Sequence, residues 1–182
     1  MIAAAILICR GIAAQDPARQ KVVYWDRCAF GQIAYCNKLG ILHYDAKDYA
    51  KARVLYKKAC DGGAAYACTN LGGIYFNGHG VRQDDEKARS LYERACSGGN
   101  ASGCMRLGWI YHTGHGVSQN YVKARLFYER ACDDGGALGC NNLGWLYENA
   151  DGVTKDDRKA RALYRRACDD GEPLGCENLE AI

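Results

Sequence analysis

The chain has 182 residues, of which 25% are charged, and its formal net charge is +3. Basic and acidic residues alternate along the chain, and no basic stripe with interleaved aromatic residues occurs, which argues against a nucleic-acid partner. The 11 cysteines instead suggest an oxidising compartment.

The N-terminal segment is apolar from Met1 to Cys9 and continues into Ile12-Ala13-Ala14-Gln15. This pattern predicts a signal peptide over residues 1–14, whose removal would take Cys9 and leave an even number of thiols. Arg10 interrupts the pattern and no basic residue precedes it, so a frayed first helix is the alternative. The segment is too short to span a bilayer.

The rest of the chain, residues 15–182, repeats one motif. Lys-Ala-Arg begins at residues 51, 87, 123 and 159, and Leu-Gly begins at 39, 71, 107 and 143. Apolar residues around each motif recur at the spacing of one face of a helix. We therefore expect an all-α solenoid without a second domain. Its predicted elements are a lone helix over 17–28, helix pairs over 33–60, 65–96, 101–132 and 137–168, and a terminal helix over 173–181.

The connections support these helix pairs. Gly78 and Gly114 can adopt the positive φ that ends a helix, while Asp84, Asn120 and Asp156 can cap the helix that follows. Gly72 recurs inside a helix, where glycine is unfavourable, so we expect two helix backbones to approach closely there.

Ten cysteines form five pairs that are each eight positions apart in the sequence. They are Cys28/Cys36, Cys60/Cys68, Cys96/Cys104, Cys132/Cys140 and Cys168/Cys176. On one unbroken helix the two Cα atoms would lie about 12 Å apart, whereas a disulfide needs about 4.4–6.8 Å. Turn residues between the members indicate a chain reversal, which favours disulfides. Zinc ligands and buried free thiols are the alternatives.

The recurring residues also resemble a known family. Leu71-Gly72, Tyr75, Gly78, Gly80-Val81, Asp84, Lys87-Ala88, Tyr92 and Ala95-Cys96 look like a Sel1-like repeat, and the cysteine pairs resemble the Helicobacter cysteine-rich protein subgroup. The resemblance implies a right-handed α/α superhelix, akin to tetratricopeptide arrays, with helix pairs cross-linked by disulfides. It also implies an exported protein, periplasmic or secreted, that acts as an adaptor or contacts a host. Some relatives carry a β-lactamase label.

Catalytic motifs are missing from the sequence. The four serines, Ser90, Ser97, Ser102 and Ser118, begin no Ser-x-x-Lys motif, and there is no Gly-x-Ser-x-Gly. His79, His112 and His115 fit loop or helix positions of the repeat better than a zinc site. We therefore expect no catalytic residue, metal or cofactor, and weak β-lactam binding or hydrolysis is kept as the alternative function.

Positions that vary within the fixed frame are the candidate ligand contacts on the concave face of a solenoid. These candidates are Asn70, Arg106, Trp109, Asn142 and Trp145. Asparagine can pair with a peptide backbone and arginine with a carboxylate. The alternative is that the tryptophans pack between repeats and the asparagines are merely solvated.

The expected partner is a peptide or protein of the host or cell envelope, with a β-lactam or peptidoglycan-like ligand as the alternative. The chain is expected to be monomeric.

Overall fold

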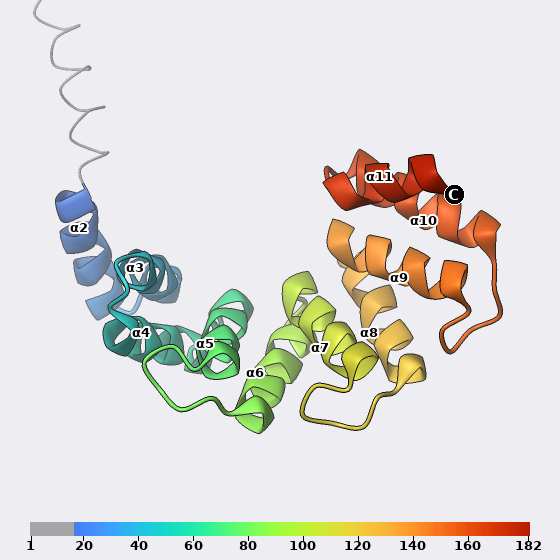
Figure 1. Ribbon diagram of the computed structural model, residues 1–182. Coiled ribbons are helices and arrows are strands. Elements are labelled where there is room, and N and C mark those ends of the chain that lie inside the picture. Colours follow the sequence, from blue (N-terminus) through green and yellow to red (C-terminus); the bar gives the residue numbers. More distant parts are fainter. Residues whose placement is uncertain (1–16) are drawn as a thin grey trace, which may run out of the picture. The chain divides into compact units, whose positions relative to one another are not determined.

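The computed structural model describes residues 17–182, and the predicted signal peptide therefore lies outside the described residues. The described residues separate into two compact units, with the division between Ala64 and Ala65. The first unit holds three helices, α2 (Pro17–Ala29), α3 (Ile33–Asp45) and α4 (Tyr49–Asp61). In Figure 1 these are the blue and teal helices.

The second unit holds seven helices. They are α5 (Ala65–Asn77), α6 (Asp85–Ser97), α7 (Ala101–Thr113), α8 (Tyr121–Asp133), α9 (Ala137–Asn149), α10 (Asp157–Asp169) and α11 (Pro173–Ala181). Residues 17–182 contain no element other than these ten helices and their connections, so the expected all-α fold of stacked helix pairs is confirmed. Each odd-numbered helix from α3 to α9 pairs with the helix that follows it. We call α3, α5, α7, α9 and α11 the first helices, and α2, α4, α6, α8 and α10 the second helices.

The residues of each element explain where it begins and ends. Asp84, Asn120 and Asp156 accept a hydrogen bond from the backbone N–H three residues further on, which satisfies a donor that the first helical turn leaves open. Gly114 ends α7 with a φ of 74°. The expected capping chemistry is therefore present.

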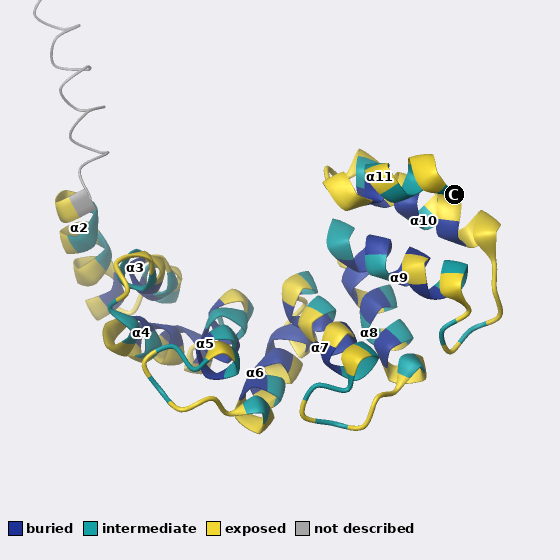
Figure 2. Cartoon of the chain, viewed as in Figure 1, coloured by how far each residue is buried: buried dark blue, intermediate teal, exposed yellow. Residues whose placement is uncertain are grey.

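The core lies between the two helices of each pair and also between neighbouring pairs, as where Tyr128 of α8 packs with Leu143 and Leu146 of α9. The recurring tyrosine of the second helix, such as Tyr128, is buried against the recurring glycine of the first helix. A Cβ on Gly108 would lie 2.4 Å from Cδ1 of Tyr128, so the absence of a side chain permits the contact. This confirms the close approach expected from the repeated glycine. Figure 2 shows the buried residues on the sides of the helices that face one another.

Disulfides join the end of one helix to the start of the next. Cys28–Cys36 joins α2 to α3 in the first unit. In the second unit, Cys96–Cys104, Cys132–Cys140 and Cys168–Cys176 join each second helix to the first helix that follows, with Cα–Cα distances of 4.6, 4.5 and 4.6 Å. Cys60 and Cys68 are also disulfide-bonded. The chain reversal inferred from the cysteine spacing is therefore confirmed.

Candidate functional site

The first helices of the second unit form one continuous surface. Helix α5 contacts α7, α7 contacts α9, and α9 contacts α11. Equivalent repeat positions therefore form rows across the four helices, and we call this surface the first-helix face. Asn70, Arg106 and Asn142 occupy one row, two residues after the framework cysteine. Trp109 and Trp145 occupy the next row along the helices, three residues further on, so the fold brings all five candidates onto one face.

The two tryptophans are partly packed and partly exposed. The centroid of the Trp109 ring lies 5.7 Å from the centroids of both the Phe76 and the His115 rings. Trp109 is 36% exposed. The ring centroids of Trp145 and His112 are 4.9 Å apart, and Trp145 is 38% exposed. Each indole thus bridges to the preceding helix pair while the rest of its surface faces water. Packing and ligand contact are compatible roles for these residues.

We call the row of Asn70, Arg106 and Asn142 the asparagine row. Its member Asn142 is joined by hydrogen bonds to asparagines beside it. Nδ2 of Asn141, which is buried, lies 3.4 Å from Oδ1 of Asn142, and Oδ1 of Asn141 accepts from Nδ2 of Asn178 at 2.9 Å. Asn178 continues the row onto α11 and was not among the sequence-predicted residues. Its position two residues after Cys176 is the signal that could have found it. Arg106, by contrast, is exposed on α7.

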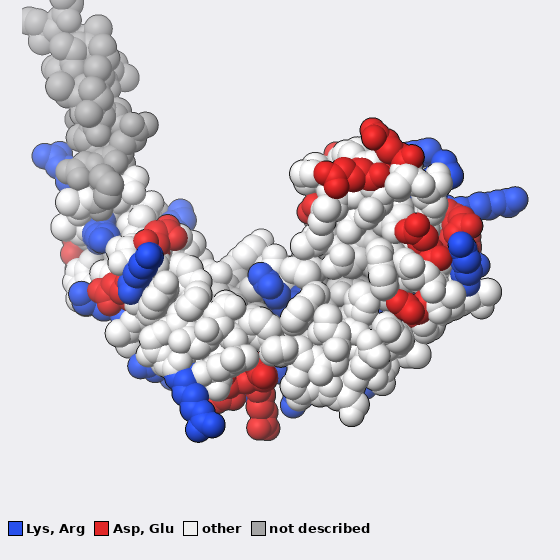
Figure 3. Space-filling model, in the orientation of Figure 1, with Lys and Arg blue, Asp and Glu red and all other residues white. Residues whose placement is uncertain are grey.

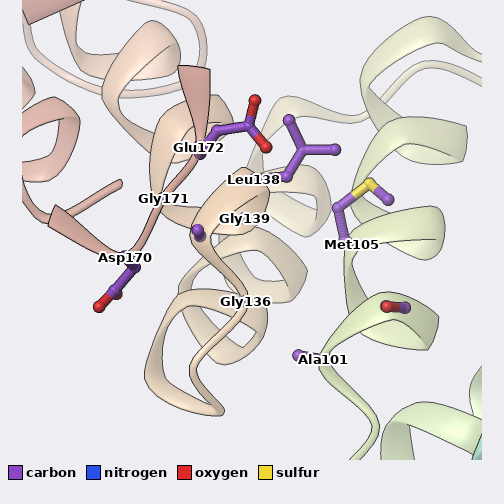
Figure 4. Close-up of a pocket in the computed structure, with 10 residues that line it drawn as sticks. Ala101, Met105, Gly136, Leu138, Gly139, Asp170, Gly171 and Glu172 are labelled. Atoms are coloured by element: carbon purple, nitrogen blue, oxygen red, sulfur yellow. The ribbon is translucent and has the colours of Figure 1, made fainter. Parts of the chain in front are cut away.

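A hollow of about 320 Å³ lies at the N-terminal end of α7 and α9. Met105 and Leu138 line it from these helices, and Asp170, Gly171 and Glu172 line it from the turn before α11. Figure 4 shows Met105 and Leu138 on opposite sides of the space, with Glu172 beside Leu138. The hollow adjoins the asparagine row because Leu138 lies one helical turn before Asn142. Sequence reasoning missed it because turns from separate repeats meet there.

The histidines take part in packing and pairing. Nδ1 of His112 lies 3.3 Å from the Tyr128 hydroxyl, and Nε2 of His115 lies 3.3 Å from Oδ1 of Asp85. Burial lowers the pKa of His112, while the nearby Asp151 carboxylate acts in the opposite direction. Within residues 17–182, no group of three or more His, Cys, Asp or Glu side chains is arranged to hold a metal ion.

The serines are dispersed over the surface of the second unit. All four are exposed: Ser90 and Ser97 on α6, Ser102 on α7, and Ser118 in the following loop. Ser102 lines the hollow, and the side chains lining it include carboxyl groups but neither histidine nor lysine. In the view of Figure 3 the surface over α7 is largely uncharged, while acidic side chains gather over α11. Among the helices of residues 17–182, none has the length and apolar character that a membrane-spanning segment needs.

Comparisons with known proteins agree with this architecture. The family model described as the Sel1 repeat matches residues 32–63, 65–100, 101–136 and 137–172. No curated protein shows significant similarity to the chain.

Solved structures with the same fold come from several bacteria. A protective antigen of uropathogenic Escherichia coli strains, which displays an SLR fold, is 26% identical with a TM-score of 0.78 over 88% of this chain and 36% of its own. A Sel1 repeat protein from Oxalobacter formigenes is 28% identical, with a TM-score of 0.74 over 81% of this chain and 62% of its own. The chain therefore spans less than two thirds of either protein.

A third structure shares the cysteine-rich character. Helicobacter pylori cysteine rich protein B is 28% identical, with a TM-score of 0.54 over 68% of this chain and 94% of its own. Together with the disulfides described above, this similarity confirms the resemblance to the Helicobacter cysteine-rich subgroup.

Proposed function

Because the chain belongs to the Sel1 repeat family, we propose that it is an exported scaffold that binds a peptide or protein partner on its first-helix face. Export is supported by the disulfides, which persist in oxidising compartments outside the cytoplasm. The partner belongs to the cell envelope or to a host.

One observation carries the binding proposal: two half-packed indoles lie beside a row of polar side chains on adjoining helices. The packed part of each indole fixes its orientation, and the exposed part offers a rigid apolar surface that costs little conformational entropy on binding. Arg106 lies one helical turn from Trp109 and can pair with a carboxylate. Asn70 and Asn142 can hydrogen-bond to a peptide backbone.

The proposal is tested by covalent capture followed by an affinity measurement. A photo-crosslinking amino acid at position 106 should trap a partner from periplasmic or host-cell extract, whereas the same group at position 165, which is exposed on α10, should not. The trapped partner is then purified for calorimetry. Arg106→Glu should raise its Kd about tenfold or more, because a like charge would face the carboxylate.

Arg165→Glu is the matched control, since it reverses the same charge on a second helix. Equal affinities of the Arg106→Glu variant and the unmodified chain would contradict the proposal. So would an equal loss of affinity in both variants, which would indicate a general effect of net charge.

The alternative of β-lactam binding or hydrolysis rests on the family resemblance alone. Turnover of a chromogenic β-lactam clearly above background, by protein purified free of host lactamases, would favour that alternative.

A further inference from the structure

Trp25 on α2 stands at a position where every other second helix has a charged residue. The equivalent residues of the four following second helices are Lys57, Glu93, Glu129 and Arg165. Trp25 is 61% exposed, so burial within the described fold does not account for an indole there. Large apolar side chains exposed in groups commonly mark interaction sites.

The surface around Trp25 is a continuous apolar groove between α2 and α4. Three adjoining hollows of about 170, 400 and 270 Å³ are all lined by Trp25. Val54 and Leu55 of α4 line two of them, and His43 of α3 lines two. Val22 and Val54 are largely exposed. We call this surface the Trp25 groove, and it lies entirely within the first unit.

The rim of the Trp25 groove is basic. Lys21, Lys51 and Lys58 each line one of the three hollows, and no acidic side chain lines any of them. Lys51 pairs with Asp48 at 2.9 Å, and Lys58 donates one hydrogen bond to the backbone oxygen of Cys28 at 3.0 Å. An ammonium has three donors, so Lys58 can bind a further acceptor. The groove therefore combines apolar walls with an excess of positive charge.

We propose that the Trp25 groove binds a peptide segment that combines aliphatic side chains with carboxylates. The aliphatic groups would fill the space between Trp25 and Val54, and the carboxylates would face the lysines. The largest hollow lies within the range of about 300–1,000 Å³ that is common for ligand pockets. This site is independent of the first-helix face, which belongs to the second unit. A concave groove suits a peptide better than a flat lipid surface.

The test uses the full chain and a short fluorescent peptide in which leucine and glutamate alternate. Binding is followed by fluorescence anisotropy. The Leu/Glu peptide should bind, and peptides with lysine for glutamate or serine for leucine should bind about tenfold more weakly or worse. Trp25→Lys should raise the Kd of the Leu/Glu peptide about tenfold or more, because a central aromatic anchor is lost.

Trp25→Lys should keep the fold, since lysine stands at the equivalent Lys57, and an unchanged unfolding midpoint would verify this. Arg165→Glu, an exposed charge reversal on α10 of the second unit and outside both proposed sites, should leave the Kd unchanged. Lys21→Glu should weaken binding, as the charge argument requires.

Four results would overturn the proposal. One is an unchanged Kd in Trp25→Lys, and another is no binding of the Leu/Glu peptide. Binding to phosphatidylglycerol vesicles without peptide binding would indicate a lipid surface instead. A concentration-dependent dimer that disappears in Trp25→Lys would identify a second copy of the chain as the occupant.

Discussion

Gly108 of α7 packs directly against the buried ring of Tyr128 of α8. Replacing Gly108 with alanine would place a Cβ 2.4 Å from a buried ring that has no room to move. We expect Gly108→Ala to lower the free energy of unfolding by about 1–3 kcal/mol, as overpacking does. Gly73→Ala is the matched control, because the nearest atom would be 4.0 Å away.

In the control, alanine improves the helix propensity of α5 without a clash. Gly73→Ala should therefore raise the free energy of unfolding by about 0.5–1 kcal/mol. Urea unfolding of both variants measures the difference. The same sign of change in both would mean that the tyrosine contact does not dictate glycine at this crossing.

Ala150 ends α9 in the left-handed conformation, with a φ of 61°. The equivalent residue after α7 is Gly114, which adopts the same conformation without a side-chain penalty. We expect Ala150→Gly to stabilise the chain by about 1 kcal/mol, because the left-handed region costs a non-glycine residue about 1–2 kcal/mol and glycine returns part of this in backbone entropy. Thermal unfolding would test this, and a lower midpoint in the variant would contradict it.

His112 should make stability depend on pH. Its pKa is lowered in the folded chain, chiefly by burial, so below about pH 6.5 the unfolded chain binds a proton that the folded chain binds more weakly. Stability is therefore lost as the pH falls from about 6.5 towards the folded pKa. His112→Phe removes this group and retains an aromatic ring, as at the equivalent Phe76.

The measurement is the free energy of unfolding at about pH 7.5 and about pH 5.5 for both chains. The decrease on acidification should be smaller in His112→Phe, because all other titrating groups are shared. An equal decrease would show that His112 does not couple folding to protonation.

At the scale of the helices, disulfides inside each unit hold a second helix to the first helix that follows. The Cys132–Cys140 bridge lies inside the second unit and packs against Ala167 of the next pair. Replacing both cysteines with alanine should lower the free energy of unfolding by roughly 2–3 kcal/mol, the value that chain entropy gives for so short a loop. Guanidinium unfolding of the variant measures this loss.

The Cys168–Cys176 bridge provides the comparison, because it joins only the short α11 to the unit. Its removal should mainly let α11 fray, which hydrogen exchange would detect as faster exchange confined to residues 173–181. Equal global losses in the two variants would contradict this difference between internal and terminal helices.

The helices could be predicted from the sequence because their apolar residues follow the helical period and their ends carry capping residues. The helix crossings could also be predicted, since glycine weakens a helix and its recurrence there indicates a close contact between backbones. Side-chain contacts between the two helices of a pair were not predictable in this way. Lys87, Lys123 and Lys159 lie over Tyr75, Tyr111 and Tyr147 at 4.2, 5.0 and 4.2 Å. Both residue types recur in the sequence, but their contact depends on how the pair is packed.

The candidate site was less predictable than the fold. Equivalent positions in the repeats were enough to predict that the candidate residues share one face. They predicted no contact between the side chains of these residues. They also did not reveal that Asn141 is buried between Asn142 and Asn178, or that turns from different pairs enclose the hollow by Met105. Trp25 departs from the frame, and its exposure became visible only in the structure.

For the whole molecule, the decisive prediction concerns oxidation. Ten cysteines lie in disulfides within the described residues, and nearly all of them are buried. Protein isolated from its native compartment and alkylated without reduction should therefore carry no label at these ten positions. After unfolding and reduction all ten should be labelled, and mass spectrometry of the peptides distinguishes the two states.

Buried thiols could also resist alkylation in a folded chain, so the first labelling must be done in denaturant. Disulfides survive unfolding, whereas shielded thiols become reactive. Labelling of the ten cysteines in denaturant without reductant would place the chain in a reducing compartment. The helix pairs would then have to be held by packing alone, and the proposed export would lose its support.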